Sequence, residues 1–232
     1  MNFIELVKWA WSDACDNSHS CLNNYEYEKG RSQWNLLITK DEWLEKQSFE
    51  TLSKVYGCGL KKILVDILIP NLNGHTTQLD LVFINKSGIY VIEVKNYTCN
   101  AEGDNKDKWV RRELNGKVNK FQNPIVQNNN HIKCLQSLLT HYPDEYFKSI
   151  IVFADTCKFK YNNNSDLKYD TRVVNYKELK ATIKEMIKSS ETVLSDENIY
   201  RIYDKLSEYA RYSNEDRKKH LEYVQSIKGV IN

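Results

Sequence analysis

The sequence predicts an α/β fold, a mixed β-sheet flanked by helices, and three observations support this class. Residues 78–84 and 89–95 are rich in Val, Ile, Leu, Tyr and Phe, and the turn-like composition between them predicts a β-hairpin. Residues 149–154 form a continuous apolar run after a helical segment, which is typical of a buried parallel strand reached by a crossover. Helical patterns dominate the rest of the chain towards its C-terminus.

The 232 residues are expected to divide into an aromatic-rich helical N-terminal extension (1–40), the α/β core (41–175) and a helical C-terminal subdomain (176–232). The extension has an apolar helical stripe near its start and several tryptophans and tyrosines. Aromatic side chains near lysines can stack on the bases of single strands. They also fill cores and interfaces, and we favour this packing role.

A helix is predicted to begin at the capping box Thr39-Lys40-Asp41-Glu42 and to end at Gly57-Cys58-Gly59. It carries Phe49 and Leu52 on its apolar face, and Glu50 borders that face. An acid in this position either faces a cleft or meets solvent. Residues 60–69 follow as a strand that ends at Pro70 and is expected beside the strand at 78–84.

After residue 97, a loop is expected to lead to a second hairpin. Asn115-Gly116 joins the runs 109–114 and 117–121, and Asn-Gly is the strongest short-range hairpin signal. This hairpin carries four basic residues that are candidate contacts to phosphate groups, Arg111, Arg112, Lys117 and Lys120. The alternative is a solvated strand face.

Asn123 is predicted to cap a helix that has Pro124 in its first turn. Gln127 and His131 lie four residues apart and therefore share one face of this helix. His131 is a candidate contact to water or phosphate, although a lone histidine on a helix is also compatible with an exposed position.

The segments after the apolar run 149–154 are less informative about function. Residues 155–170 are polar and rich in Asn, which predicts a loop, and residues 172–174 are expected to form an edge strand. Helices are predicted to begin near residues 175, 195 and 214.

Composition limits the compartment and the partners. The formal charge of +2 neither supports nor excludes a nucleic-acid partner, because only a local basic patch would matter. Six scattered cysteines predict reduced thiols, and no apolar run reaches the 18 residues of a membrane span. The N-terminus lacks the apolar segment of a signal peptide. We therefore expect a cytoplasmic protein without a membrane partner, and the excess of Lys over Arg suggests an AT-rich bacterial genome.

The hairpin at 78–95 carries the candidate chemistry. A turn centred on Lys86-Ser87 places Asp80 opposite Glu93, and like charges in that position repel. Lys95 shares the face of Glu93. Mg²⁺ or Mn²⁺ would relieve the repulsion, and the lysine would orient or deprotonate a water or stabilise negative charge on a phosphate. The alternative is that these charges are solvated, since acids and lysines are common at strand ends.

Two motifs give this hairpin a known context. The stretch QLDLVFINKSGIYVIEVKNY resembles the core signature of the nuclease-related domain (NERD), a branch of the PD-(D/E)XK nuclease superfamily. The block FQNPIVQ, which contains Gln127, is similar to the N-P-x-x-Q helix of that family. Glu50 is a weaker third match, and the resemblance runs from about residue 45 to residue 154.

The resemblance implies a restriction-endonuclease-like core and roles for particular residues. Asp80, Glu93 and the carbonyl of Val94 would hold Mg²⁺ or Mn²⁺, and Lys95 would be the catalytic lysine. Gln127 would face the site, and Glu50 would be a further acid. The implied activity is metal-dependent hydrolysis of phosphodiester bonds, with DNA as the favoured substrate.

Three questions stay open at this level. RNA is an alternative substrate, and a nucleic-acid-binding or interaction module that keeps the scaffold without turnover is an alternative function. Association of copies of the chain through the terminal helices is also compatible with the sequence.

Overall fold

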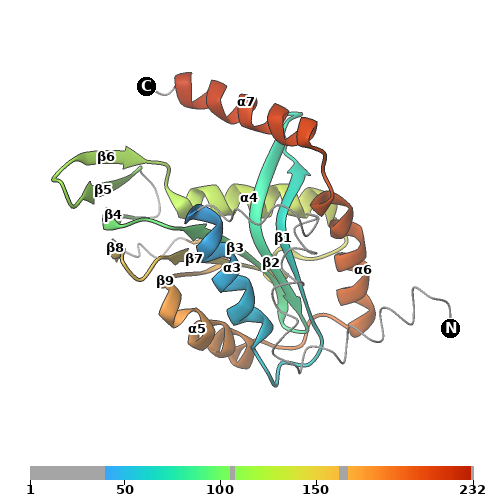
Figure 1. The fold of residues 1–232 in the computed structure, drawn as a ribbon. Coiled ribbons are helices and arrows are strands. Elements are labelled where there is room, and N and C mark those ends of the chain that lie inside the picture. The colour runs from blue at the N-terminus through green and yellow to red at the C-terminus, as the bar shows by residue number, and fades with distance from the viewer. Residues whose placement is uncertain (1–39, 105–107, 162–166, 231–232) are drawn as a thin grey trace.

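The computed structural model describes residues 40–104, 108–161 and 167–230 (Figure 1). The predictions for the aromatic-rich extension and for Thr39 lie outside these residues. The helices are α3 (Lys40–Ser53), α4 (Pro124–Leu138), α5 (Tyr176–Ser189), α6 (Asp196–Ser207) and α7 (Asn214–Val230), with short 3₁₀ turns η2 (Asp144–Tyr146) and η3 (Glu208–Ala210). No helix in the described ranges is long and apolar enough to cross a membrane.

The main sheet has the strand order β1-β2-β3-β7-β9. Its strands are β1 (Lys61–Pro70), β2 (Thr76–Asn85), β3 (Gly88–Lys95), β7 (Phe147–Phe153) and β9 (Asp170–Asn175). The first three strands run antiparallel, whereas β3, β7 and β9 are parallel. The predicted α/β class with a mixed sheet is therefore confirmed, and so are the parallel strand after α4 and the edge strand.

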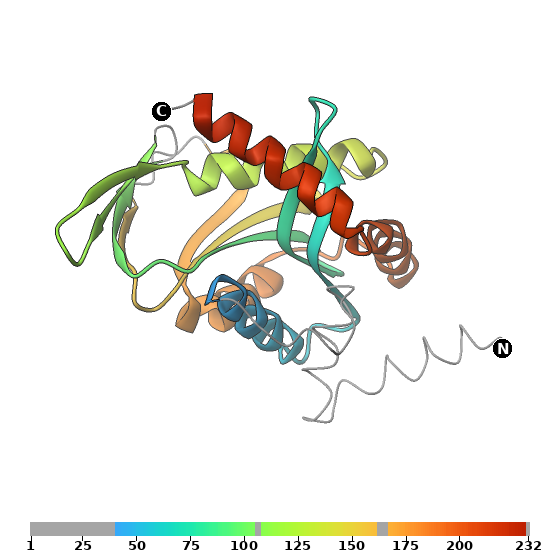
Figure 2. The same ribbon diagram turned by 45° about the horizontal axis from the view of Figure 1, so that its top comes forward.

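Helices cover both faces of the main sheet (Figure 2). On one face, α4 and α6 bury Ile132, Leu135 and Ile202 against apolar side chains of β1, β2 and β3. On the other face, α3 and α5 bury side chains such as Leu52 and Ile183 against the same strands and β7. The strands are apolar on both faces because each face is covered.

The predicted helical tail joins this core. Asn175 and Glu178 form a capping box at the start of α5, and the hydroxyl of Ser195 accepts the N–H of Asn198 at the start of α6. The C-terminal helix α7 lies against the β1–β2 hairpin, where Tyr223 stacks on His75 with 3.9 Å between ring centroids. All three predicted helix starts in the tail are present.

A second, smaller sheet has the order β6-β5-β4-β8. It consists of β4 (Cys99–Gly103), β5 (Trp109–Glu113), β6 (Val118–Phe121) and β8 (Lys158–Tyr161). The Asn-Gly hairpin between β5 and β6 is confirmed. The prediction of loops after residue 97 and across 155–170 is wrong in part, because β4 and β8 pair there in parallel. Phe159 and Tyr161 alternate with lysines in β8 and pack in the cluster around Trp109.

Side chains alternate between the two faces of the sheet along β1 and β2, and this alternation is interrupted in both strands at neighbouring positions, Asp66 and Asp80. Asp66 has a φ of 52°, in the left-handed region that non-glycine residues rarely adopt. Leu79 packs on the face of Val82 and Ile84 rather than on the face of Leu81. The pairing register places Asp66 beside Asp80, so both acids lie where the regular sheet is interrupted.

Gly88 fixes the turn between β2 and β3. Its φ is 135°, and a Cβ added there would lie 2.4 Å from the carbonyl oxygen of Tyr146. We expect Gly88→Ala to lower the free energy of unfolding by about 3 kcal/mol, because the backbone must shift.

Gly74→Ala is the matched control, since Gly74 has a φ of 77° and open space around it. It should cost only about 1 kcal/mol. Urea unfolding of both variants checks this, and equal losses would contradict the close contact.

Candidate active site

The candidate site lies where β2 and β3 separate. The register predicted for this hairpin is confirmed through the pair Leu81–Ile92, after which the ladder ends. Asp80 occupies the next position, and its Oδ2 accepts the N–H of Val94 at 2.7 Å. Asp80 therefore turns its carboxylate into the gap between the strands instead of standing in a regular cross-strand pair with Glu93.

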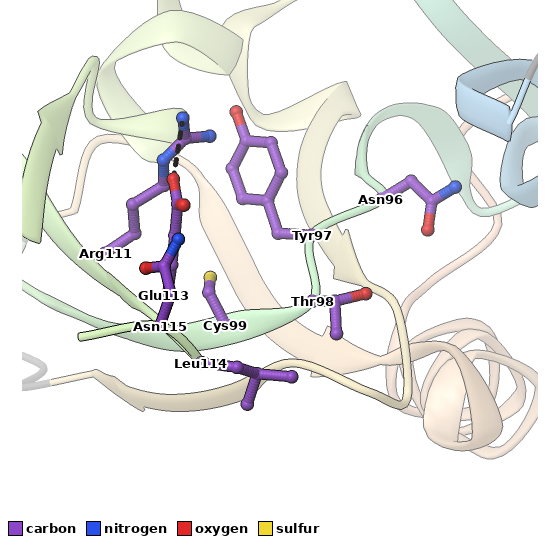
Figure 3. A pocket seen from close by; sticks show the side chains of 8 residues that line it. All are labelled: Asn96, Tyr97, Thr98, Cys99, Arg111, Glu113, Leu114 and Asn115. Carbon is purple, nitrogen blue, oxygen red and sulfur yellow. Dashed lines mark ion pairs between the residues drawn. The ribbon is translucent and has the colours of Figure 1, made fainter. Parts of the chain in front are cut away.

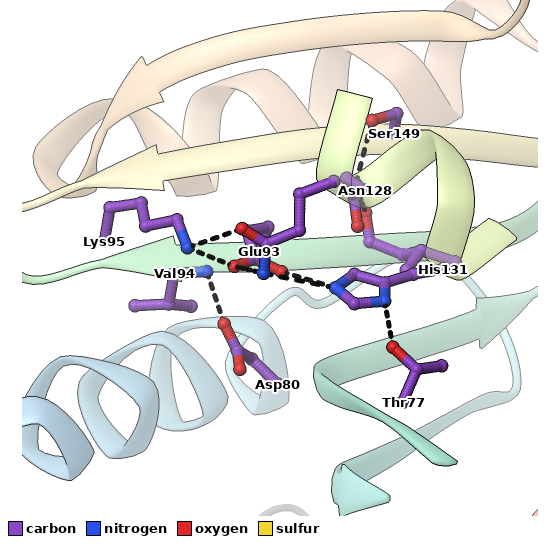
Figure 4. Close-up of polar contacts among 10 residues, drawn as sticks. Thr77, Asp80, Glu93, Val94, Lys95, Asn128, His131 and Ser149 are labelled. Carbon is purple, nitrogen blue, oxygen red and sulfur yellow. Dashed lines mark hydrogen bonds and ion pairs between the residues drawn. The ribbon is translucent and has the colours of Figure 1, made fainter. Parts of the chain in front are cut away.

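Glu93 is the centre of the site (Figure 4). It is only 2% exposed. Its Oε1 accepts hydrogen bonds from Lys95 Nζ at 2.5 Å and from Gln127 Nε2 at 2.7 Å. Its Oε2 lies 3.2 Å from Nε2 of His131. Gln127 also accepts a hydrogen bond from Lys95 at 3.0 Å, so these side chains form one closed network.

The N-terminal part of α4 positions Gln127 and His131. The side chain of Asn123 accepts backbone N–H groups of the first turn, and Pro124 stands at its start, as predicted. Asn128 then donates to the carbonyl of Val91 at 2.9 Å and to Ser149 Oγ at 2.8 Å. These bonds attach the helix to β3 and β7, and the adjacent residue Gln127 is held beside Glu93.

His131 is buried, and the alternative of an exposed helix histidine is wrong. Its Nδ1 lies 2.9 Å from the hydroxyl of Thr77, and its Nε2 lies 3.3 Å from Gln127 as well as close to Glu93. The ring thus bridges β2 to the acid on β3. Both ring nitrogens contact protein groups in this arrangement. The predicted role of His131 in binding nucleic acid therefore stays a prediction.

The charges in the site act strongly on one another. Burial raises the pKa of Asp80 well above its ordinary value, and the carboxylates of Glu93 and Glu45 add to this. Burial would also raise the pKa of Glu93, but the Lys95 ammonium and His131 outweigh it and lower that pKa to about 2. Burial would lower the pKa of Lys95, but Glu93, then the phenol of Tyr97 and then Asp80 raise it above its ordinary value. Three carboxyl groups, those of Asp80, Glu93 and Glu45, thus act on one another beside one ammonium, and a bound cation would relieve the repulsion among them.

Glu45 is a site residue that the sequence analysis missed. It acts on the pKa of Asp80, whereas Glu50 lies in an i,i+4 ion pair with Lys54 at 3.9 Å. A signal was present, because Glu45, which is half-buried, precedes Phe49 by four residues and Leu52 by seven and so lies in line with the buried stripe of α3. A glutamate inside such a stripe needs a partner.

Glu45→Gln is expected to reduce any metal-dependent cleavage by about 10-fold, because it removes a charge near Asp80 without changing the size of the side chain. Glu50→Gln should leave the rate within about two-fold, as for a surface substitution. Single-turnover cleavage rates of the two variants provide the measurement. A larger loss for Glu50→Gln would place the further acid at Glu50, as the family resemblance suggested.

Asp66 is a second missed acid. It is 1% exposed, and its Oδ1 accepts a hydrogen bond from Gln78 at 2.6 Å. An aspartate inside the apolar run Leu-Val-Asp-Ile-Leu was the available signal. Strained, buried polar residues of this kind cluster at functional sites.

The donor set suits a hard cation. Asp80 and Glu93 contribute carboxylates, and the carbonyl of Val94 lies on the same strand edge as its N–H, which bonds Asp80. Oxygen ligands of this kind favour Mg²⁺ or Mn²⁺ over zinc. In the described ranges, no group of three or more His, Cys, Asp or Glu side chains is arranged to hold a metal. A metal here would therefore depend on the two carboxylates and the carbonyl.

The four predicted basic contacts lie on the second sheet. Arg112, Lys117 and Lys120 are exposed. Arg111 is half-buried, and its guanidinium lies 5.3 Å from the ring centre of Tyr97. The structure thus brings together Asp80, Glu93, Lys95, Gln127 and His131, and it sets the basic residues apart on an adjacent hairpin.

The fold and the site define an α/β protein in which a buried acid, a second acid and a lysine meet at a strand edge beside a helix. Residues 40–154 match the family model described as nuclease-related domain, NERD. This part of the chain is therefore a nuclease-related domain, which confirms the resemblance carried by the hairpin and the Asn-Pro helix. The chain is also 27% identical over 165 residues to an uncharacterized protein of Bacillus anthracis, covering 71% of this chain and 74% of that protein. No solved structure matches the chain significantly.

Proposed function

We propose that this protein is a metal-dependent nuclease that hydrolyses phosphodiester bonds in DNA. The observation that carries the proposal is that Glu93, Lys95 and Gln127 from β3 and α4 form one hydrogen-bond network, and that Asp80 of β2 is bonded to the N–H of Val94 between Glu93 and Lys95. The nuclease-related domain supports the same reaction class. A buried charge cluster is costly to maintain, and a catalytic or binding role accounts for it.

Each residue has a role in this proposal. Asp80, Glu93 and the Val94 carbonyl would hold Mg²⁺ or Mn²⁺, which supplies Lewis acidity towards phosphate and water. Lys95 is ion-paired with Glu93, so it is held as an ammonium that stabilises negative charge on the reacting phosphate. Gln127 contacts both of these side chains and fixes their orientation.

One observation favours a second candidate function. Both carboxylate oxygens of Glu93 already have protein partners, Lys95 and Gln127 on one and His131 on the other. A site closed in this way suits a module that binds nucleic acid without turnover. Metal titration separates the two functions, because a nuclease requires Glu93 to exchange a protein partner for the ion.

The test is cleavage of circular and linear DNA, single- and double-stranded, with Mg²⁺, Mn²⁺ or EDTA, together with an RNA of the same sequence. We expect cutting of DNA that requires a divalent ion and is lost in Glu93→Ala. Cleavage of the RNA but of none of the DNA substrates would identify RNA as the substrate. Binding without cutting under every condition would favour the non-catalytic module.

The cysteines bear on the compartment. The four cysteines in the described ranges are free, and the buried pair Cys99 and Cys157 stands with 3.8 Å between sulfur atoms. Free thiols so close together suit a reducing compartment. We place the proposed activity in the cytoplasm of a bacterial cell.

A further inference from the structure

An open pocket begins at the residue after Lys95 (Figure 3). Its volume is about 470 Å³, within the range of pockets that take small ligands. The segment from Asn96 to Cys99 forms one wall, and β5 with its following turn forms the other, from Arg111 and Glu113 to Asn115. The pocket therefore lies between the end of β3 and the second sheet, next to the candidate active site.

Tyr97 connects this pocket to Lys95. It lines the pocket, and its backbone N–H donates to the carbonyl of Lys95 at 3.0 Å. Its ring is held edge-on against Phe121, with 5.4 Å between centroids. The pocket therefore adjoins the end of β3 that carries the lysine.

Arg111 gives the pocket a cation. Its side chain is 34% exposed and lies against the ring of Tyr97, and one terminal nitrogen is 3.6 Å from Glu113. That ion pair is long, and the same oxygen, Glu113 Oε1, also accepts a hydrogen bond from Asn119 Nδ2 at 3.0 Å. The Nε of Arg111 is buried without a hydrogen-bond partner in the described part of the chain. In the described part of the chain the terminal nitrogens of the guanidinium have no closer ion-pair partner than Glu113, so they retain donors for an anion, and a phosphate matches their planar arrangement.

We propose that this pocket is a subsite for one unpaired nucleotide next to the scissile phosphodiester bond. Arg111 binds the phosphate of that nucleotide, and the wall from Asn96 to Thr98 with Tyr97 contacts its sugar and base. The inference rests on the proposed function and adds to it a substrate class, DNA with a single-stranded segment at the cut. A base in a duplex stays stacked on its neighbours and must leave the stack to enter a pocket of this size.

Arg112 provides a matched control. It has the same charge and adjoins Arg111 on β5, but its side chain is exposed and points to the other face of the strand. A general attraction between basic residues and DNA would respond to both substitutions equally. A pocket-specific contact would respond more to the substitution of Arg111, and would do so with the single strand more than with the duplex.

The test measures binding in EDTA, where cutting does not interfere. Fluorescence anisotropy compares a labelled single strand of about 12 nucleotides with a hairpin duplex of matched length. We expect Arg111→Ala to weaken binding of the single strand by about 10-fold and binding of the duplex less, whereas Arg112→Ala, which removes an exposed candidate phosphate contact, should weaken binding of both to the same small extent of about two-fold. Equal losses for the two variants, or no loss for Arg111→Ala, would overturn the proposal.

A second measurement separates this inference from the proposed function. Cleavage of the same single strand is followed with Mn²⁺ in the wild type and in Arg111→Ala. If Arg111→Ala weakens single-strand binding selectively and neither protein cuts the strand, the subsite is supported and the proposed nuclease activity is contradicted. If the wild type cuts with metal and Arg111→Ala has the same single-strand binding and cleavage rate, the nuclease proposal is supported and the subsite is contradicted.

Discussion

Lys95→Met is expected to lower the rate of DNA cleavage by about 10³-fold, the scale of a group that acts on the reacting phosphate. Methionine keeps much of the length of the side chain and removes its charge. The ammonium donates to both Glu93 and Gln127, and among the described residues it is the one lysine or arginine side chain with a hydrogen bond to Glu93. Its loss removes the charge that would stabilise a developing phosphate anion.

The measurement is designed to distinguish Lys95 from the metal ligands. Mn²⁺ binding is followed by calorimetry in the absence of DNA, alongside single-turnover cleavage. Lys95→Met should keep metal binding, or strengthen it, because a competing cation has been removed from Glu93. Glu93→Gln should lose both metal binding and cleavage. This contrast assigns the lysine to catalysis and the acid to the metal.

The control concerns folding, because removal of one partner of a buried ion pair is costly. Thermal unfolding of Lys95→Met is compared with that of the double variant Glu93→Gln/Lys95→Met, which removes both charges of the Glu93–Lys95 ion pair. The double variant should recover stability and stay inactive. Wild-type cleavage by Lys95→Met would refute a catalytic lysine at this position.

The hairpin and α4 were predictable because their signals are local. The turn between β2 and β3 determines the register, and the Asn-Pro start of α4 sets the phase that brings Gln127 to Glu93. Both depend on residues that are close in sequence. The roles drawn from the family resemblance fall on residues that the structure brings together, apart from Glu50.

The missed residues depend on contacts between distant segments. The charge of Glu45 on α3 acts on Asp80, and Asp66 lies on β1, where its positive φ interrupts the strand beside Asp80. Periodicity does not report which strand a helix covers or where a strand bends. Buried charge within an apolar pattern was the available indication, and it had to be weighed against solvation. The strand β8 was missed for a similar reason, because its partner β4 is far away in sequence.

Trp109→Ala is expected to lower the free energy of unfolding by about 3–5 kcal/mol, the range for a fully buried aromatic residue. Trp109 is 0% exposed and stacks on Phe153 of the main sheet and Tyr161 of the second sheet, with centroids 5.7 and 6.1 Å away. Its indole N–H donates to the carbonyl of Asp104 at 2.8 Å. The substitution therefore leaves a large cavity between the two sheets.

Trp43→Ala is the matched control, since Trp43 on α3 is 52% exposed. It should change stability by less than about 0.5 kcal/mol. Urea unfolding followed by circular dichroism measures both variants, and Trp109→Phe gives an intermediate loss if the alanine variant does not fold. Because Trp109 and Arg111 lie on the same strand, a loosened β5 should also weaken binding of a single strand in the pocket beside Tyr97. Similar small losses for Trp109→Ala and Trp43→Ala would mean that the second sheet does not pack on the first through this residue, and the position of Arg111 beside the site would lose its structural support.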